Sequence, residues 1–469
     1  MFLLTTPDAG RTALVETASG TRLSYRELAS LVRAVGADLA ADRKRLIFVV
    51  GSRQRSSVIA YLSAIEAGHA VAWIDPALPD RSFDRLLATY EPELVVPSTG
   101  RAGQRPVPES LSEDRHSTLG RVWHARSPAA AHPIHPDLAC LLATSGTTGS
   151  TKLVRLSRTN LAANASAIVG ALGLSADDVA ITSLPIAHAF GLSVLDSHLV
   201  AGSTVVLDES SILQPDFWRV MRDERVNSLA GVPLTFELLR RLDPAQILPE
   251  TVTSMIQAGG RLHPDHVAFF RDLMAARGGS FRVMYGQTEA TARISVWPEI
   301  TPLDKVASVG RVIPDGEISI DEATGEIRYR GPNVMMGYAE SRADLARPGD
   351  LRELATGDLG HLDEDGFLFV TGRTKRIAKL AGCRINLDDV EAMLVGMSAA
   401  AVEIDGRLAV FVEAPGGGDQ IDIRERLIET LDLDPALLRV TTIEALPRSS
   451  AGKVLYTCLT GTPASRPTS

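Results

Sequence analysis

Apolar residues recur along the chain at two different spacings, one typical of buried strands and one typical of amphipathic helices. Short runs rich in β-branched residues, such as residues 45–50 (RLIFVV), precede stretches with helical spacing, such as residues 56–68 (SSVIAYLSAIEAG). Residues 69–75 and 80–90 repeat this order, which continues as far as residues 281–286 (FRVMYG). Strands that alternate with helices in this way favour parallel sheets covered by helices.

One stretch of the N-terminal part interrupts this alternation. Residues 99–135 are rich in Pro, Ser, Arg and His and show no apolar period, so we expect a surface excursion between two strand–helix layers. The alternation then resumes, with strands expected at residues 138–144, 153–157, 179–185 and 203–207 and a helix at residues 159–173.

The pattern changes again towards the C-terminus. Short strands separated by Gly, Asp and Pro turns predict a β-rich subdomain at about residues 305–372, and strands alternate with helices again from residue 375. We therefore predict an α/β protein. Its large N-terminal domain, residues 1–374, has stacked strand–helix layers plus the β-rich subdomain, and a small mobile α+β domain occupies residues 375–469. In the small domain we expect helices at residues 388–397 and 423–431 and a strand at residues 408–414.

Composition narrows the possible functions. The 469 residues suffice for two or three domains with clefts between them. The 48 basic and 57 acidic residues give a net charge of −9 without a Lys/Arg cluster, so we expect no nucleic-acid partner. No apolar stretch approaches the roughly 18 residues that cross a bilayer, and no basic segment precedes the apolar N-terminal residues, so we expect neither a membrane span nor a signal peptide. Three separated cysteines exclude a disulfide framework and indicate the cytoplasm.

A loop rich in glycine and small hydroxyl residues follows the strand expected at residues 138–144. Its glycines allow sharp turns, its N–H groups can point at an anion, and one lysine adds positive charge, so the loop predicts a phosphate ligand. A Walker A loop is excluded, because that motif has its lysine directly after the last glycine. A flexible surface loop is the alternative. The candidate phosphate-binding residues are Thr144, Ser145, Gly146, Thr147, Thr148, Gly149 and Lys152.

Two further stretches carry residues suited to nucleotide chemistry. In residues 284–291 (MYGQTEAT), Tyr285 can lie against a base, Thr288 can donate to a phosphate and Glu289 can bind Mg²⁺. Asp358 stands in a turn, where an aspartate mostly satisfies the backbone. Its carboxylate is also a group that can chelate two ribose hydroxyls.

Basic residues mark two stretches near the C-terminus. Residues 373–391 form a basic loop that leads into a helix, and the first-turn acids Asp388 and Asp389 suit a helix N-terminus. Residues 446–454 (LPRSSAGKV) place Lys453 directly after a glycine in a polar loop. A lysine in such a loop is ordinarily only solvated, so Lys453 becomes a candidate only together with the other stretches.

These stretches, in this order, resemble the adenylate-forming superfamily of acyl-CoA synthetases, aryl and fatty acid ligases, nonribosomal peptide synthetase adenylation domains and beetle luciferase. The resemblance runs from residues 21–29 (TRLSYRELA) to Lys453. It implies an enzyme that uses ATP and Mg²⁺ to convert a carboxylic acid to acyl-AMP with release of pyrophosphate. The acyl group would then pass to the thiol of CoA or of phosphopantetheine on an acyl carrier protein.

The resemblance also assigns roles to the candidate residues. The phosphate loop would bind the β and γ phosphates of ATP, although Thr151 and Leu153 stand where the family usually has Pro and Gly. The implied catalytic residues are Lys453, Thr288 at the α-phosphate, and Glu289 at the metal. No general base is needed, because the attacking carboxylate is already ionised at neutral pH. The implied adenine- and ribose-binding residues are Gly259, Gly260, Arg261, Tyr285, Gly286, Gln287, Asp358 and Arg373.

Similar enzymes carry out two half-reactions in one cleft by rotating the small C-terminal domain. Lys375 occupies the hinge position of the family. In the first orientation, Lys453 would reach the carboxylate and the α-phosphate. In the second, a loop that includes Lys379 and Gly382 would replace it and line the passage for the thiol.

Residues 183–202 resemble the segment that forms the wall of the acyl pocket in this family. Ala189 stands about where domains that activate α-amino acids have an aspartate, so we expect an acid without an α-amino group. His188, Phe190 and Gly191 are the expected pocket residues, although His188 can equally be structural. Asp196 is an alternative anchor that we expect to face elsewhere on the helix.

The acyl acceptor remains open at this level. Sixteen residues follow Lys453, so we expect the thiol to come from CoA or from a separate carrier protein. An adenylate-forming ligase that transfers the acyl group to an amine is an alternative, and a non-catalytic nucleotide-binding relative is another.

Overall fold

The computed structural model describes most of the chain, in two compact units. The first unit comprises Met1–Ile318 and Tyr329–Leu354, and the second comprises Ser319–Arg328 and Ala355–Ser469. The described residues are 3–4, 8–51, 53–97, 107–126, 133–144, 152–380, 383–394, 397–413, 420–431, 433–449 and 452–460. None of the helices in these ranges combines the length and the apolar composition that crossing a membrane requires.

An eight-stranded sheet forms one half of the first unit. Its central strands are parallel, and antiparallel strands extend both edges. The centre is parallel because strands such as β3 and β4 are apolar runs buried on both faces. The order is β19 (Gly337–Ala339), β9 (Leu153–Ser157), β8 (Leu138–Ala143), β4 (Ala70–Ile74), β3 (Leu46–Val50), β5 (Leu94–Val96), β7 (Gly120–Ala125) and β6 (Leu111–His116).

Strands β6 and β7 lie within residues 99–135, for which the sequence predicts only a surface excursion. They form an antiparallel hairpin that pairs Leu111 with Ala125 and His116 with Gly120. The hairpin extends the sheet edge through β5. Most of its side chains are exposed or half-buried, and its buried apolar residues are Leu111, Leu119, Val122 and Trp123. The apolar period is therefore too weak to predict these strands.

A nine-stranded sheet forms the other half of the first unit. Strands β14, β13, β12, β10, β11 and β1 are parallel, so their carboxyl ends meet at one edge, where open α/β sheets bind ligands. The order is β16 (Arg311–Val312), β15 (Ser295–Val296), β14 (Ser280–Tyr285), β13 (Ser254–Gln257), β12 (Ser228–Gly231), β10 (Val179–Ile181), β11 (Thr204–Leu207), β1 (Thr12–Glu16) and β2 (Thr21–Ser24).

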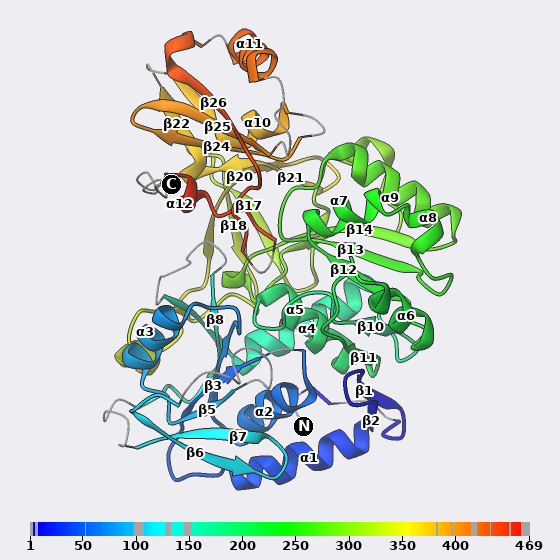
Figure 1. The fold of residues 1–469 in the computed structure, drawn as a ribbon, viewed down its shortest axis with the longest axis vertical. Coiled ribbons are helices and arrows are strands. Elements are labelled where there is room, and N and C mark those ends of the chain that lie inside the picture. The colour runs from blue at the N-terminus through cyan, green and yellow to red at the C-terminus, as the bar shows by residue number, and fades with distance from the viewer. Residues whose placement is uncertain are drawn as a thin grey trace, which may run out of the picture. The chain divides into compact units, whose positions relative to one another are not determined.

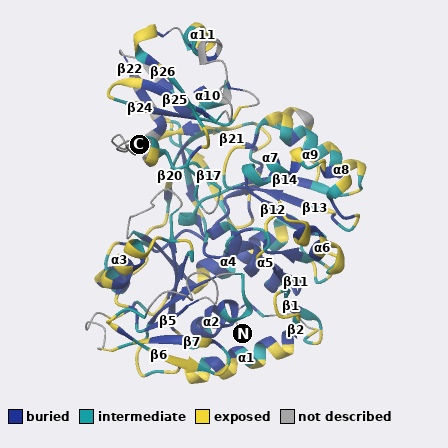
Figure 2. Cartoon of the chain, in the orientation of Figure 1, coloured by how far each residue is buried: buried dark blue, intermediate teal, exposed yellow. Residues whose placement is uncertain are grey.

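Helices form three layers around the two sheets (Figure 1). The layer between the sheets shares one buried core with strands of both. It consists of α1 (Tyr25–Asp38), α2 (Arg55–Glu66), α4 (Arg158–Leu172) and α5 (Ala189–Ala201). Figure 2 shows α2, α4 and α5 largely buried, whereas α1 buries one face and exposes the other. Helix α3 (Asp80–Tyr90) packs on the outer face of the eight-stranded sheet. The outer face of the nine-stranded sheet packs against α6 (Pro215–Asp223), α7 (Pro233–Arg241) and α9 (Pro264–Ala276), and the short α8 (Pro244–Ile247) follows α7.

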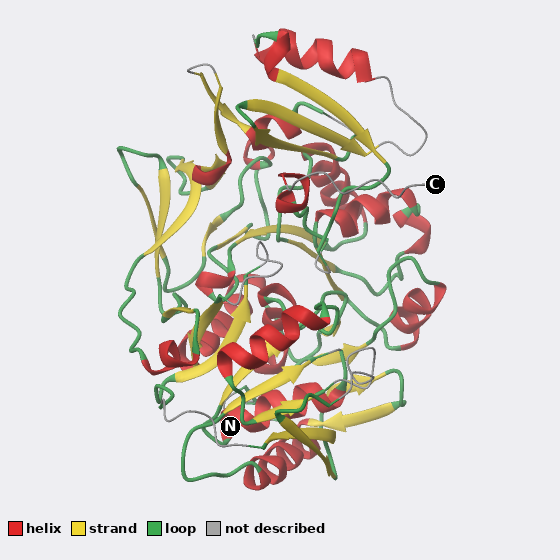
Figure 3. Ribbon diagram, turned by 60° about the vertical axis from the view of Figure 1, so that its left-hand side comes forward, coloured by secondary structure: helices red, strands yellow, loops and turns green. Residues whose placement is uncertain are grey.

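The second unit is smaller and mixes strands with short helices (Figure 3). Its main core lies among α10, α11 and the three-stranded sheet. The strands are β17 (Glu317–Ile320), β18 (Glu326–Arg330), β20 (Leu354–Leu362) and β21 (Leu368–Arg373) in one sheet, β22 (Ile377–Leu380) and β23 (Cys383–Asn386) in a hairpin, and β24 (Ala399–Ile404), β25 (Arg407–Glu413) and β26 (Leu438–Ile443) in another sheet. The helices are α10 (Leu387–Ala392), α11 (Gln420–Leu431) and α12 (Tyr456–Thr460).

Helix α10 is shorter than predicted, since the sequence predicts a helix over residues 388–397 and α10 ends at Ala392. Its start is defined by Asn386, whose side chain accepts from the backbone N–H of Asp388 at 3.0 Å. Asp388 and Asp389 lie in the first turn, as the sequence predicts. The acidic first turn marks where the helix begins, and no comparable signal marks its end.

A buried arginine joins several elements of the second unit. The Arg376 guanidinium donates to the carboxylates of Asp388 and Glu391 and lies over the Tyr456 ring, 3.9 Å from its centroid. Glu391 also accepts from the Tyr456 hydroxyl at 3.0 Å and from the Ala401 N–H at 2.7 Å. Arg376 thereby ties the residue next to the predicted hinge to α10, β24 and α12. Rotation about Lys375 stays a prediction.

Candidate active site

The predicted phosphate loop joins two adjacent antiparallel strands. Thr144 follows β8 and Lys152 precedes β9, and the ladder continues up to the pair Ala143 and Leu153. The loop therefore connects neighbouring strands at one edge of the eight-stranded sheet. The predicted phosphate-binding residues Ser145, Gly146, Thr147, Thr148 and Gly149 lie outside the described residues.

Tyr338 connects the two ends of the predicted phosphate site. The Lys152 ammonium lies over the Tyr338 ring, 3.6 Å from its centroid. The Tyr338 hydroxyl donates to Glu289 Oε1 at 2.9 Å. Strand β19 holds Tyr338 in place by pairing it with Val154 on β9. One ring thus links the candidate phosphate-binding lysine to the candidate metal ligand, which lie far apart in the sequence.

The Tyr338 phenol remains a proton donor at neutral pH. Burial, and then the neighbouring Glu289 carboxylate, raise its pKa well above the ordinary value. Sequence reasoning missed Tyr338, because a single tyrosine in a short edge strand has no distinguishing pattern. The only signal was its position in the β-rich stretch after the predicted nucleotide motifs.

We expect Tyr338→Phe to raise the KM for Mg·ATP by about tenfold. The variant keeps the ring under Lys152 and loses one hydrogen bond to a charged group, which is worth about 1.5 kcal/mol. Steady-state kinetics at varied ATP concentration measure this change, and thermal unfolding checks that the fold is intact. An unchanged KM would mean that the hydrogen bond does not position Glu289.

The predicted adenine-binding residues lie at the carboxyl ends of β13 and β14. These strands are parallel neighbours, with Gln257 opposite Val283, so the segments that follow them start at the same sheet edge. The buried Gln257 amide donates to the Gly260 carbonyl at 2.9 Å. Gly259 has a φ of +88°, which favours glycine. Arg261 is exposed.

Close backbone approach explains Gly286. A Cβ atom at this position would lie 2.0 Å from the Ala292 carbonyl oxygen, so only glycine fits. The half-buried residues Tyr285 and Gln287 flank it, and Thr288 and Glu289 lie in the following 3₁₀ turn, Thr288–Ala290. The structure therefore brings these predicted residues to one short segment at the edge of the sheet.

Asp358 and Arg373 face each other across strands β20 and β21 of the second unit. The two residues are ladder partners, and Arg373 Nε donates to Asp358 Oδ1 at 2.9 Å. The Asp358 carboxylate is 8% exposed whereas the Arg373 side chain is 59% exposed, so the arginine supports the carboxylate from the solvent side. Their roles at a ribose stay predictions.

The C-terminal candidates lie in separate segments of the second unit. Lys453 lies in a turn in which its N–H donates to Ser449 Oγ at 3.2 Å and the Ser449 N–H donates to its carbonyl at 2.8 Å. Lys379 pairs with Arg384 in the hairpin of β22 and β23. Gly382 lies outside the described residues. Lys375 lies in the 3₁₀ turn Thr374–Arg376.

The predicted acyl-pocket residues surround the N-terminus of α5. His188 is the N-cap, and its Nε2 lies 3.1 Å from Asp75 Oδ2 after strand β4, a contact that the sequence did not predict. Phe190 packs against the buried cluster that contains Ala258 and Met284. Gly191 is required by packing, because a Cβ atom there would lie 2.2 Å from the Pro185 carbonyl oxygen.

Asp196 lies inside the helix layer. It is 2% exposed, and its Oδ2 accepts from the Tyr61 hydroxyl at 3.1 Å. Its Oδ1 is buried without a hydrogen-bond partner among the described residues. Burial raises the pKa of this carboxyl to about 8, so it is mostly protonated at neutral pH.

We expect Asp196→Asn to stabilise the protein increasingly as the pH rises from 5 to 8. In this window the folded wild type binds a proton that the unfolded chain, with an Asp pKa near 3.9, has released. Wild-type stability therefore falls with rising pH, by at most about 1.4 kcal/mol per pH unit from this group. Thermal unfolding of both proteins across this range measures the difference. A difference that does not depend on pH would contradict the assignment.

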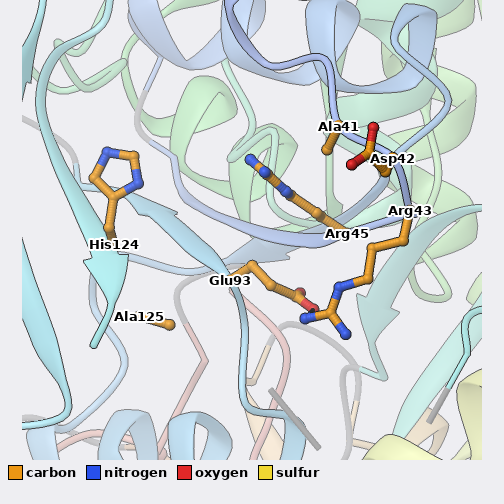
Figure 4. A pocket seen from close by; sticks show the side chains of 7 residues that line it. All are labelled: Ala41, Asp42, Arg43, Arg45, Glu93, His124 and Ala125. Carbon is orange, nitrogen blue, oxygen red and sulfur yellow. Dashed lines mark ion pairs between the residues drawn. The ribbon is translucent and has the colours of Figure 1, made fainter. Parts of the chain in front are cut away.

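A further cavity, of about 410 Å³, is lined by none of the residues described above. Figure 4 shows its lining: Ala41, Asp42, Arg43, Arg45, Glu93, His124 and Ala125. The Arg43 guanidinium lies 3.7 Å from the Glu93 carboxylate, which also pairs with Arg342 at 2.6 Å. One carboxylate thus lies between two guanidinium groups, and we assign no chemistry to this cavity.

Comparison with known proteins places the arrangement in a family. The family described as "AMP-binding enzyme" matches residues 5–339. The chain belongs to that family. This match confirms the resemblance to adenylate-forming enzymes that the motifs indicated.

Several relatives of this AMP-binding enzyme are CoA ligases by name. Indoleacetate–CoA ligase from Aromatoleum aromaticum is 33% identical over 69% of this chain and 66% of its own length. 2-Succinylbenzoate–CoA ligase from Listeria innocua is 23% identical over 95% of both chains. Oxalate–CoA ligase from Arabidopsis thaliana is 28% identical over 72% of this chain and 70% of its own length.

Solved structures confirm the predicted α/β fold class of this AMP-binding enzyme. ATP-bound MatB from Rhodopseudomonas palustris superposes with a TM-score of 0.77, at 23% identity, and covers 97% of this chain and 96% of its own. MenE from Bacillus subtilis in complex with AMP also has a TM-score of 0.77, at 22% identity over 96% of both chains. The same MenE in complex with ATP and magnesium ion has a TM-score of 0.75 at 21% identity, over 95% of this chain and 96% of its own.

Proposed function

We propose that this chain is an AMP-forming acid–thiol ligase. It activates a carboxylic acid with ATP to an acyl adenylate, releases pyrophosphate and transfers the acyl group to the thiol of CoA. The observation that carries the proposal is the contact of Tyr338 with both Lys152 and Glu289 beside the phosphate loop. The relatives named as CoA ligases support CoA as the acceptor.

Charge explains why the site needs these residues. A carboxylate and the α-phosphate that it attacks are both anions, so the site must supply cations that stabilise the charge of the transition state. We assign this role to Lys453, with Thr288 as a donor to the α-phosphate. Lys152 neutralises the outer phosphates and the departing pyrophosphate.

The chemistry of Glu289 fits a bound Mg²⁺ ion. Within the described ranges no group of three or more His, Cys, Asp or Glu side chains gathers as a metal cage. Mg²⁺ commonly binds instead through one or two carboxylates together with substrate phosphates, which a single carboxylate such as Glu289 allows. When bound with ATP, Mg²⁺ would supply further neutralisation of phosphate charge.

Pyrophosphate exchange over a panel of carboxylic acids tests the proposed function. In the presence of the right acid, the enzyme should incorporate labelled pyrophosphate into ATP, and the full reaction should release AMP. Release of ADP would overturn the proposal. Omitting CoA and offering amines separates a thiol ligase from an amide ligase, because only the amide ligase would then form a stable acyl product. A carrier protein as the acceptor is tested by replacing CoA with phosphopantetheinylated carrier.

A further inference from the structure

Arg293 is a buried arginine directly after the nucleotide segment. Its side chain is 2% exposed. The guanidinium lies over the Phe190 ring, 4.2 Å from the centroid, and its Nε lies 3.3 Å from the sulfur of Met284. Phe190 is a predicted acyl-pocket residue, and Met284 is on β14 just before Tyr285. The positive charge therefore lies at the junction of the predicted acyl pocket and the predicted adenine site.

Arg293 lacks an acidic partner throughout the described part of the chain. Its polar contacts are the Met284 sulfur and the carbonyl of its own neighbour, Ala292, at 3.1 Å. Two other buried arginines pair with carboxylates: Arg342 with Glu93 at 2.6 Å, and Arg376 with Glu391. The buried Arg155 and Arg282 donate instead to carbonyls of distant segments, such as Met336 and Ala171 at 2.8 and 2.9 Å. Burying an unpaired charge is unfavourable, so native proteins normally pair it.

The environment of Arg293 is consistent with this isolation. Burial alone lowers the pKa of the guanidinium, to about 9, and no neighbouring charge offsets it. The group still carries its charge at neutral pH. An aromatic face and a thioether attract a cation weakly compared with a carboxylate, so an incoming anion at this position would gain a charge-assisted contact in an apolar setting.

The backbone fixes Arg293 in this position. Thr291 and Ala292 have φ angles of 57° and 141°, a region that non-glycine residues rarely occupy. Buried asparagines compensate for this strain. Asn164 accepts from the Arg293 N–H at 3.2 Å, and Asn333 donates to the Arg293 carbonyl at 2.8 Å. Backbone strain that the surrounding hydrogen bonds maintain is typical of functional positions, so we interpret Arg293 as one.

We propose that Arg293 binds a second carboxylate of the acid substrate, so that the enzyme activates a dicarboxylic acid at one of its two ends. This inference rests on the proposed function and names its substrate class. The acids in the names of the relatives do not decide the matter, because indoleacetate has one carboxylate whereas oxalate and 2-succinylbenzoate have two. The proposal rests instead on the guanidinium beside Phe190, which has no acidic partner among the described residues.

A panel of acids matched in carbon skeleton tests the inference. Pairs such as butyrate and succinate, heptanoate and pimelate, or benzoate and phthalate differ by one carboxylate. In acid-dependent pyrophosphate exchange, we expect the best diacid to exceed its matched monoacid by about 10- to 10²-fold in kcat/KM, as expected for one hydrogen-bonded charge pair. A preference for monoacids throughout would overturn the inference and leave the proposed function intact. No exchange with any acid would instead count against the proposed function.

Two methionine variants test whether Arg293 is the source of the preference. Arg293→Met retains much of the length and apolar bulk of the side chain, and we expect it to lose most of the diacid preference, seen as a fall of about 10- to 10²-fold in the ratio of diacid to monoacid kcat/KM. The matched control is Arg282→Met. Arg282 is also buried on β14, but it donates to the Ala171 carbonyl at 2.9 Å, and its removal should leave the diacid-to-monoacid ratio unchanged.

Thermal unfolding and a conservative variant separate binding from structure. A merely structural Arg293 would lower exchange with both classes of acid together and leave their ratio unchanged, which would overturn the inference. Arg293→Lys keeps the charge without the planar fork, so we expect it to recover part of the diacid preference, seen in KM more than in kcat. If Arg293→Met does not fold, the lysine variant and the wild-type panel decide between the outcomes.

Discussion

Lys453→Ala is expected to lower acid-dependent pyrophosphate exchange by about 10²- to 10³-fold, the usual effect of removing one preorganised electrostatic contact. We assign to this lysine the role of screening the electrostatic repulsion between the attacking carboxylate and the α-phosphate. Its turn is defined by the two backbone contacts with Ser449, so the substitution removes the charge without altering the backbone hydrogen bonds. Exchange kinetics over the acid panel measure the loss.

The same variant should still use a preformed acyl adenylate. Transfer of the acyl group from the adenylate to CoA is assigned to the other orientation of the small domain, in which Lys379 and Gly382 take the place of Lys453. The control is Lys305→Ala, whose ammonium pairs with Asp304 at 3.5 Å and which has no assigned role. Equal losses in exchange and in thiol transfer would refute the division of roles between the two lysine-bearing loops.

Glu289→Gln is expected to lower adenylation by about 10²- to 10³-fold at ordinary Mg²⁺ concentration, because the phosphate charge is then neutralised less effectively. The amide keeps the shape of the side chain, and its oxygen can still accept from the Tyr338 hydroxyl. The variant should therefore fold normally and differ mainly in its affinity for the metal. Raising the Mg²⁺ concentration should recover part of the activity.

The metal titration distinguishes this role from a structural one. We expect the concentration of Mg²⁺ that gives half-maximal exchange to rise by at least tenfold in Glu289→Gln, and by much less in Tyr338→Phe. An unchanged Mg²⁺ dependence would mean that Glu289 is not a metal ligand, even if the activity were lost.

The sequence predicted the parts of the fold that repeat a local pattern. The buried runs that became β3 and β4, and the helices after them, have strong apolar periods, and the prediction of an α/β layered fold is confirmed by the solved relatives. The hairpin of β6 and β7 escaped prediction because most of its side chains are exposed or half-buried, so its apolar period is weak. Helix α10 was overestimated because its N-terminus carries a clear signal and its C-terminus does not.

The candidate site was predictable where it consists of contiguous motifs. Tyr285 to Glu289 are expected from the motif itself, and the structure adds the reason for Gly286. Tyr338 and Arg293 escaped prediction for a different reason. The importance of each depends on its neighbours in space. Tyr338 lies beside a carboxylate, and Arg293 has no carboxylate partner among the described residues. The residues adjacent in the sequence do not reveal either fact.

The contacts of Arg376 limit which backbone torsion angles can change in the predicted rotation of the small domain. Because its guanidinium is anchored to two carboxylates and a tyrosine ring of α10 and α12, torsion angles beyond this residue cannot change without breaking several bonds at once. Only Lys375 and the residues before it are free of that restraint. A proline substituted at Lys375 would then stiffen the predicted hinge, whereas one placed after Arg376 would disturb the small domain without restricting the predicted rotation.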